Sequence, residues 1–133
     1  MGGHQERNKR AGTENVAGIV GIGTAVNLIY NEFDSYNNKL KYLRDYYITQ
    51  IEKNIPNIKL NGDKVKRLPG NANISFDGID AGQLLLNLDA YGICASAGSA
   101  CTSGSLEPSH VLIAIGLKEN LTQGALRLSL IHI

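Results

Sequence analysis

The chain has 133 residues, which is enough for one domain with a modest hydrophobic core. Thirteen basic and twelve acidic side chains leave a net charge of +1, so charge gives no case for a nucleic-acid or membrane-surface protein. We find no apolar run close to the ~20 residues that span a bilayer, and no signal peptide in the Gly-rich, charged N-terminus.

The first part of the chain is predicted to be a loop and then a long helix. Residues 1–12 read as a loop because they are rich in glycine and charge, and Thr13 is a good N-cap for the helix after them. Apolar residues then recur at helical spacing as far as Pro56, which ends the helix. They are Val16, Ile19, Val20, Val26, Tyr30, Phe33, Tyr36, Leu40, Leu43, Tyr47, Ile51 and Ile55. The spacing predicts one long helix, or two nearly continuous helices with a break near Asp34-Ser35.

A short strand and a second helix are predicted next. Asn61-Gly62 is a turn signal, and apolar residues alternate with polar ones over residues 72–76, as in a strand. Asp80 is expected to cap a helix, with Gln83 three residues on as in a capping box. Gly92 is the expected C-terminal stop of that helix.

The last part of the chain is predicted to hold a loop between further elements. We expect a short strand at Ile93–Ala95, a loop at Gly98–Ser105, and a helix that starts at Glu107-Pro108 and ends at Gly116. In a final strand Leu126, Leu128 and Leu130 alternate with Arg127 and Ser129, so one face is buried and the other presents a guanidinium. This order of elements predicts an α+β fold with helices packed on a small sheet.

Cys101 is the main candidate for chemistry. Core cysteines normally have large apolar neighbours, whereas this thiol lies among glycines and serines, where it is placed to react. Loop amides and the hydroxyls of Ser99, Thr102 and Ser103 could stabilise the reactive thiolate. The sequence therefore predicts sulfur chemistry at Cys101, with an incidental loop cysteine as the alternative.

The neighbouring Cys94 and His110 have plainer interpretations. Cys94 is predicted to be a small core residue, although a disulfide or zinc pair with Cys101 stays open, at a spacing that fits no usual zinc site. His110 is read as a surface helix residue, with a general base for Cys101 as the alternative. Two cysteines this close do not make a secreted disulfide framework, so we expect a reducing, cytoplasmic setting.

Two residues are candidates for binding anions. The planar guanidinium of Arg127 suits bidentate binding of a carboxylate, and a structural ion pair explains it equally well. Thr13 opens the long helix, where free amides and a hydroxyl favour a phosphate. Helix capping alone explains Thr13 equally well.

Taken together, these segments resemble the cysteine desulfurases of the NifS/IscS-like branch, within the class-V aminotransferases. The resemblance rests on residues 2–7, 10–16, 68–76, 96–112 and 125–129. It covers essentially the whole chain, and the run from Ser96 to Leu112 around Cys101 is its most specific part.

The resemblance implies the small C-terminal domain of a fold-type-I enzyme that depends on pyridoxal 5'-phosphate and usually forms a homodimer. Such an enzyme converts L-cysteine to L-alanine and passes a persulfide to an iron–sulfur scaffold or another sulfur acceptor. By the same resemblance, Cys101 is the nucleophile, Arg127 holds the substrate carboxylate, and Thr13 reaches the cofactor phosphate of the neighbouring subunit. No resident metal is implied, and Cys101 would contact a metal only transiently, during cluster assembly.

The chain departs from the family pattern in its lysines. The cofactor lysine of the family lies in a Ser-x-His-Lys segment, and none of the eight lysines here has that context. We therefore expect residues 1–133 to be the C-terminal part of a desulfurase that does not turn over cysteine by itself. Residues 1–12 would be a linker from the missing large domain, and residues 13–133 the small domain with its active-cysteine loop at 96–107.

Two other functions stay open. The chain could be a non-catalytic module that relays sulfur or docks on a scaffold, which the missing lysine favours. It could also be a zinc or redox protein that uses Cys94 and Cys101.

Overall fold

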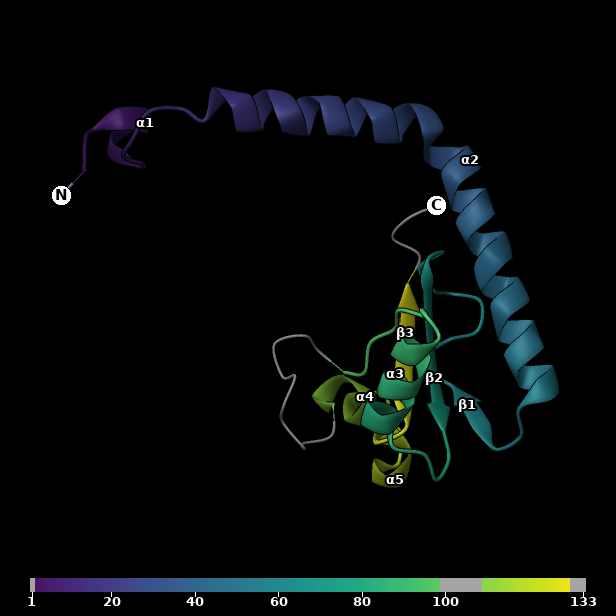
Figure 1. The fold of residues 1–133 in the computed structure, drawn as a ribbon. Coiled ribbons are helices and arrows are strands. Elements are labelled where there is room, and N and C mark those ends of the chain that lie inside the picture. Colours follow the sequence, from purple (N-terminus) through teal and green to yellow (C-terminus); the bar gives the residue numbers. More distant parts are fainter. Residues whose placement is uncertain (1, 99–108, 130–133) are drawn as a thin grey trace. The chain divides into compact units, whose positions relative to one another are not determined.

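The computed structural model describes residues 2–98 and 109–129, so Cys101, Pro108 and Leu130 lie outside the described residues. Chain contacts divide it into two compact units, Met1–Tyr36 and Asn37–Ile133. The elements, labelled in Figure 1, are α1 (Gln5–Asn8), α2 (Val16–Asn54), β1 (Ile58–Leu60), β2 (Asn71–Phe76), α3 (Ala81–Ala90), α4 (His110–Ala114), α5 (Glu119–Thr122) and β3 (Ala125–Ser129). This confirms the predicted α+β class, with helices on a small sheet.

The start of α2 corrects one prediction. Thr13 does not cap the helix, because it lies three residues before the first helical residue, Val16. The cap is Asn15, whose Oδ1 accepts a hydrogen bond from the backbone N–H of Gly18 at 3.0 Å. The preceding α1 has positive φ values at Glu6 and Arg7 (50° and 54°), so it is a left-handed turn rather than a helix.

Helix α2 runs for 39 residues without a break at Asp34-Ser35. The hydroxyl of Ser35 donates to the carbonyl of Glu32 at 2.9 Å, so this polar side chain is satisfied within the helix. The helix ends at Asn54, just before Ile55-Pro56, as predicted.

The first part of α2 is strongly apolar, which the sequence patterns did not predict. Among the described residues, α2 is the one helix long and apolar enough to cross a membrane, with an 18-residue window of mean hydropathy 1.3 that is not buried. Core helices of soluble proteins meet the same criterion, so length and hydropathy alone give α2 no membrane role.

The sheet has the strand order β1-β2-β3, and both pairs are antiparallel (Figure 1). The predicted strands at 72–76 and 126–130 correspond to β2 and β3, whereas β1 has only three residues and was not predicted. The strand expected at Ile93–Ala95 does not form. There the chain touches β3 through a single bridge between Ser96 and Arg127.

Two clusters of buried side chains form the core. In the first, Ile74, Phe76 and Leu126 of the sheet are buried, and partly buried residues of α2 and α3 pack against them. Those residues include Tyr47, Ile51, Leu84, Leu85 and Leu88. In the second, Ala125 packs with Leu112, Leu117 and Leu121 from the α4–α5 region. The short strands are therefore held by helices from both earlier and later parts of the chain.

The helix ends follow their capping residues. Asp80 caps α3 by accepting from the N–H of Gln83 at 2.9 Å, as predicted. Gly92 (φ +72°) ends it in a Schellman turn, because the N–H of Ile93 donates to the carbonyl of Leu88 at 2.9 Å. Helix α4 starts at His110 with Ser109 as its N-cap, later than the predicted Glu107-Pro108 start, and Gly116 (φ +83°) ends it as predicted.

Candidate functional site

Arg127 lies in the middle of β3 and is half-buried. Its N–H donates to the carbonyl of Ser96 at 2.7 Å, and its carbonyl accepts from the N–H of Ser96 at 3.0 Å. Both backbone groups of Arg127 are therefore used on the Ser96 side. On the other side Arg127 faces Asn73 of β2, as a pair that exchanges no backbone hydrogen bonds.

A row of polar residues crosses the sheet at this level. Asn61 follows β1, and its backbone N–H donates to the carbonyl of Asn73 at 2.9 Å. Its side chain continues the row, because Asn61 Nδ2 donates to Asn73 Oδ1 at 2.7 Å and to Ser75 Oγ at 2.8 Å. Asn61, Asn73 and Arg127 thus lie side by side on the face opposite Ile74 and Leu126. We name these three residues the polar row.

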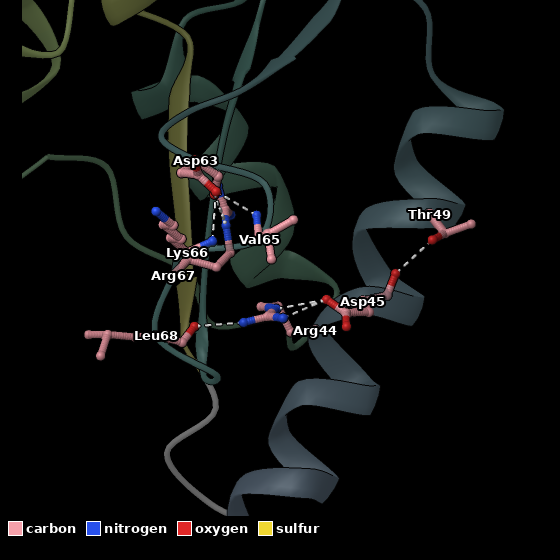
Figure 2. A network of polar contacts seen from close by, with 8 residues as sticks. All are labelled: Arg44, Asp45, Thr49, Asp63, Val65, Lys66, Arg67 and Leu68. Atoms are coloured by element: carbon pink, nitrogen blue, oxygen red, sulfur yellow. Dashed lines mark hydrogen bonds and ion pairs between the residues drawn. The ribbon is translucent and has the colours of Figure 1, made fainter.

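Two arginines and one aspartate organise the loop between β1 and β2 (Figure 2). Arg67 Nη2 donates to the backbone carbonyl of Asn61, and Arg67 Nε to the carbonyl of Asp63, both at 2.7 Å. Arg44 of α2 is buried, donates to the carbonyl of Leu68 at 3.0 Å, and forms an ion pair with Asp45 at 2.7 Å. The loop is therefore tied both to α2 and to the polar row.

Two pKa values shift in this loop. The backbone N–H groups of Lys66 and Val65 donate to Asp63 Oδ1, at 2.6 and 2.7 Å, and lower the pKa of that carboxyl. Partial burial, and then the nearby positive charge of Arg44, lower the pKa of Arg67. Arg67 stays protonated all the same, since an arginine titrates far above neutral pH.

The segment that leads to Cys101 starts beside Arg127. Cys101 itself lies outside the described residues, but Ser96 is fixed against Arg127 by its two backbone hydrogen bonds. Cys101 comes five positions after Ser96 in the sequence. The structure therefore describes the start of this segment, at Ser96, and not the position of Cys101.

The remaining predicted residues are spread over the described part of the chain. Thr13 is exposed in the first unit. Its side chain forms no hydrogen bond with any residue of the described ranges, 2–98 and 109–129. His110 is exposed at the start of α4, as predicted for a surface histidine. The described residues hold no group of three or more metal-ligating side chains.

Cys94 is exposed, so its predicted place in the core was wrong. The reason is that residues 93–95 form no strand, and therefore no alternation directs Cys94 inward. With Leu43, Tyr47 and Leu128, Cys94 lines a mostly apolar cavity of about 280 Å³. Burial raises the pKa of Tyr47, so this phenol stays neutral at physiological pH.

The sequence pattern did not single out Asn61, Asn73 or Ser96. The one available signal was the alternation over residues 71–76, which puts Asn71, Asn73 and Ser75 on the face of the strand away from Ile74. The strand order needed to put Asn73 next to Arg127 came only from the structure.

Comparisons with known proteins identify the family. The Aminotransferase class-V model matches residues 3–133. The cysteine desulfurases of Dictyoglomus turgidum and of Clostridium botulinum strain Hall are 51% and 55% identical to this chain, each over 97% of it. The chain spans about a third, 33%, of the length of each of these relatives.

Solved structures give the same answer. A NifS-like protein from Rickettsia africae superposes with a TM-score of 0.81 at 33% identity, over 98% of this chain and 33% of that one. A second NifS-like protein superposes with a TM-score of 0.80 at 31% identity, over 97% of this chain and 32% of that one. Class-V aminotransferases depend in general on pyridoxal 5'-phosphate. This chain, by its family model and by its fold, belongs to the class-V aminotransferase family.

Proposed function

We propose that this chain is the sulfur-accepting part of a cysteine desulfurase, which converts L-cysteine to L-alanine. The observation that supports this most strongly is the backbone pairing of Ser96 with the half-buried Arg127. Ser96 lies five positions before Cys101 in the sequence. The names of the relatives supply the reaction. The activity belongs to the whole protein, of which this chain matches about a third.

Arg127 binds the substrate. A guanidinium donates parallel hydrogen bonds to the two oxygens of a carboxylate, which fixes the orientation of an amino acid as well as its position. Among residues 2–98 and 109–129, no side chain forms an ion pair with Arg127. The carboxylate of L-cysteine is the proposed ligand.

Cys101 accepts the sulfur. Its thiolate attacks the sulfur of L-cysteine, a sulfur–sulfur bond forms, and the bond between that sulfur and Cβ breaks. The electron pair of the broken bond stays with carbon, and protonation there completes L-alanine. Cys101 keeps the transferred sulfur as a persulfide, so no external oxidant or reductant is needed.

Pyridoxal 5'-phosphate would supply the electron sink that this bond cleavage requires. Thr13 fits its phosphate group, because Asn15 caps α2 and the Thr13 hydroxyl is left without a partner among the described residues. The Schiff-base lysine would come from outside these 133 residues, since none of the eight lysines lies in a Ser-x-His-Lys segment. We propose that Thr13 serves the neighbouring subunit of a homodimer.

The persulfide then passes to an acceptor protein, an iron–sulfur scaffold or another sulfur acceptor. Free thiols and persulfides persist only where disulfides are kept reduced, so we place the reaction in the cytoplasm. A module that only relays sulfur is the second candidate, which the lysine pattern favours for these 133 residues taken alone.

A chimera tests the proposed function. This chain replaces the matching third of the Dictyoglomus turgidum relative, and the purified chimera with pyridoxal 5'-phosphate is treated with L-cysteine. We expect alanine release and, by mass spectrometry of peptides, one added sulfur on Cys101. Cys101→Ser should lose both signals, and Cys94→Ser, the matched control, should keep both.

Three outcomes of this test decide between the candidates. Alanine release that persists in Cys101→Ser would contradict the proposed nucleophile. A chimera that accepts sulfur from a small persulfide but releases no alanine would favour the relay module. The unfused chain should release no alanine, and turnover by it would contradict our assignment of the lysine to another part of the protein.

A further inference from the structure

We propose that Asn73 is a second carboxylate-binding residue, which donates its side-chain amide to the substrate held by Arg127. The inference rests on the proposed function, because it assigns a further contact to the same substrate. It is carried by the geometry of the polar row of Asn61, Asn73 and Arg127.

Asn73 and Arg127 lie opposite each other on neighbouring strands. The backbone N–H and carbonyl of Arg127 both bond to Ser96. The backbone carbonyl of Asn73 accepts the N–H of Asn61, on the side away from Arg127. Asn73 and Arg127 are therefore a directly opposite pair without backbone hydrogen bonds between them. In antiparallel sheets such pairs bring the side chains closest, with Cβ atoms about 4.5–5.5 Å apart.

The side-chain amide of Asn73 bonds to Asn61 through its oxygen. Its oxygen, Oδ1, accepts from Asn61 Nδ2 at 2.7 Å and so faces β1. The oxygen and nitrogen of a carboxamide diverge from one carbon, so the bond that Oδ1 makes with Asn61 leaves Nδ2 unused. Asn73 Nδ2 can only donate hydrogen bonds, and no described residue accepts one from it.

Arg127 and Asn73 have the same hydrogen-bonding character at their side-chain nitrogens. The Arg127 guanidinium and the Asn73 amide nitrogen are both donors, and two adjacent donors cannot bond to each other. A ligand that satisfies both must carry acceptors, and the positive charge selects an anion. A carboxylate has two oxygens and can meet both residues at once.

Asn61 is the side-chain partner of Asn73 within the polar row. Asn61 is 5% exposed, and its Nδ2 is held by two acceptors, Asn73 Oδ1 and Ser75 Oγ. Asn61 Oδ1 is buried without a partner among the described residues, which is an unfavourable arrangement. The two bonds of Asn61 Nδ2 orient its side chain toward Asn73 and Ser75, and Arg67 separately holds the Asn61 backbone carbonyl at 2.7 Å.

Ligand titration of the 133-residue chain tests the inference without cofactor or turnover. The side-chain amide signals of Asn73 and the Nε–H signal of Arg127 are followed by NMR while L-alanine is added. L-Alanine is the product of the proposed reaction. L-Alaninamide, which lacks the carboxylate, is the control ligand. We expect both signals to shift with one affinity for L-alanine and neither to shift with L-alaninamide.

Variants separate the role of Asn73 from that of Arg127. Asn73→Ala should weaken L-alanine binding about tenfold, since a hydrogen bond to a charged group is lost. Asn73→Asp keeps the shape and the acceptor for Asn61 but replaces the donor by a negative oxygen, so it should abolish binding. Asn71→Ala, on the same face of β2 and opposite Ser129, is the matched control and should keep wild-type affinity.

The outcomes distinguish this inference from the proposed function. If Arg127→Ala abolishes binding while Asn73→Ala and Asn73→Asp keep wild-type affinity, the role of Asn73 is wrong and the proposed function stands. If Arg127→Ala itself keeps wild-type affinity, the carboxylate site is wrong, and both fail. In the chimera, Asn73→Ala should raise KM about tenfold with little change in kcat, because the carboxylate contact is the same in the bound substrate and in the transition state.

Discussion

At the scale of single residues, Asp63 shows how backbone donors support the site. Its carboxylate accepts from the N–H groups of Lys66 and Val65, which lowers its pKa in the folded chain. The unfolded chain therefore takes up a proton at higher pH than the folded chain does. The contribution of Asp63 to stability is complete above the ordinary aspartate pKa of about 3.9 and is lost as pH falls through the lowered value. We expect the urea midpoint to decline over this range more steeply in the wild type than in Asp63→Asn.

The matched control for this prediction is Asp77→Asn. Asp77 is exposed and accepts no side-chain hydrogen bond among the described residues. It should follow the wild-type curve when urea unfolding is measured by circular dichroism from about pH 5 to pH 2. Equal slopes for the wild type and Asp63→Asn would refute the role of Asp63.

At the scale of elements, the turn before β3 depends on a close backbone approach. The Gly124 carbonyl accepts the N–H of Phe76 at 3.0 Å, and a Cβ at position 124 would lie 2.1 Å from the Phe76 carbonyl oxygen. Backbone on both sides cannot move away without breaking the β2–β3 pair. We expect Gly124→Ala to lower the free energy of unfolding by about 3 kcal/mol, the upper part of the range for overpacking. Because Arg127 follows in the same strand, its pairing with Ser96 should weaken as well.

Gly21→Ala is the control for this element. Nothing lies within 4 Å of a Cβ built at Gly21 in α2, so alanine should cause no loss and raise helix stability by up to about 1 kcal/mol. Urea unfolding of both variants provides the measurement. A Gly124→Ala protein as stable as the wild type would mean that the turn relaxes.

At the scale of the whole molecule, the first part of α2 exposes a large apolar surface. Its exposed apolar side chains are Val16, Ile19, Val20, Ile22, Val26, Leu28, Ile29, Tyr30 and Phe33. Helices that are apolar on most sides are normally covered by other protein, and the chain matches only about a third of its relatives. We expect the isolated chain to bind the dye ANS, and the double variant Ile22→Lys/Ile29→Lys to lower the fluorescence about twofold.

A pair of substitutions in the second unit serves as the comparison. Val65 and Leu68 are 82% and 75% exposed but belong to a polar loop. Val65→Lys/Leu68→Lys should therefore leave ANS fluorescence near the wild-type value. Loss of fluorescence in this pair, and not in the α2 pair, would place the dye-binding surface elsewhere.

Local features of this protein could be predicted from its sequence alone. Pro56, Asp80, Gly92 and Gly116 act on the backbone beside them, so the ends of the helices could be predicted. The sequence around Cys101 indicated the family, which the comparisons confirmed. Local patterns misplaced Cys94 and the cap of α2, because a cysteine next to a glycine turn and a threonine near a helix each fit two environments.

Which residues face each other became known only from the folded chain. The strand order β1-β2-β3 puts Asn61, Asn73 and Arg127 in one row, although they are far apart in the sequence. A strand was predicted at Ile93–Ala95, but this part of the chain pairs with β3 only through the single bridge between Ser96 and Arg127. Strand pairing is a long-range contact that no local pattern specifies, and for that reason the sequence pointed to Arg127 and only the fold pointed to Asn73.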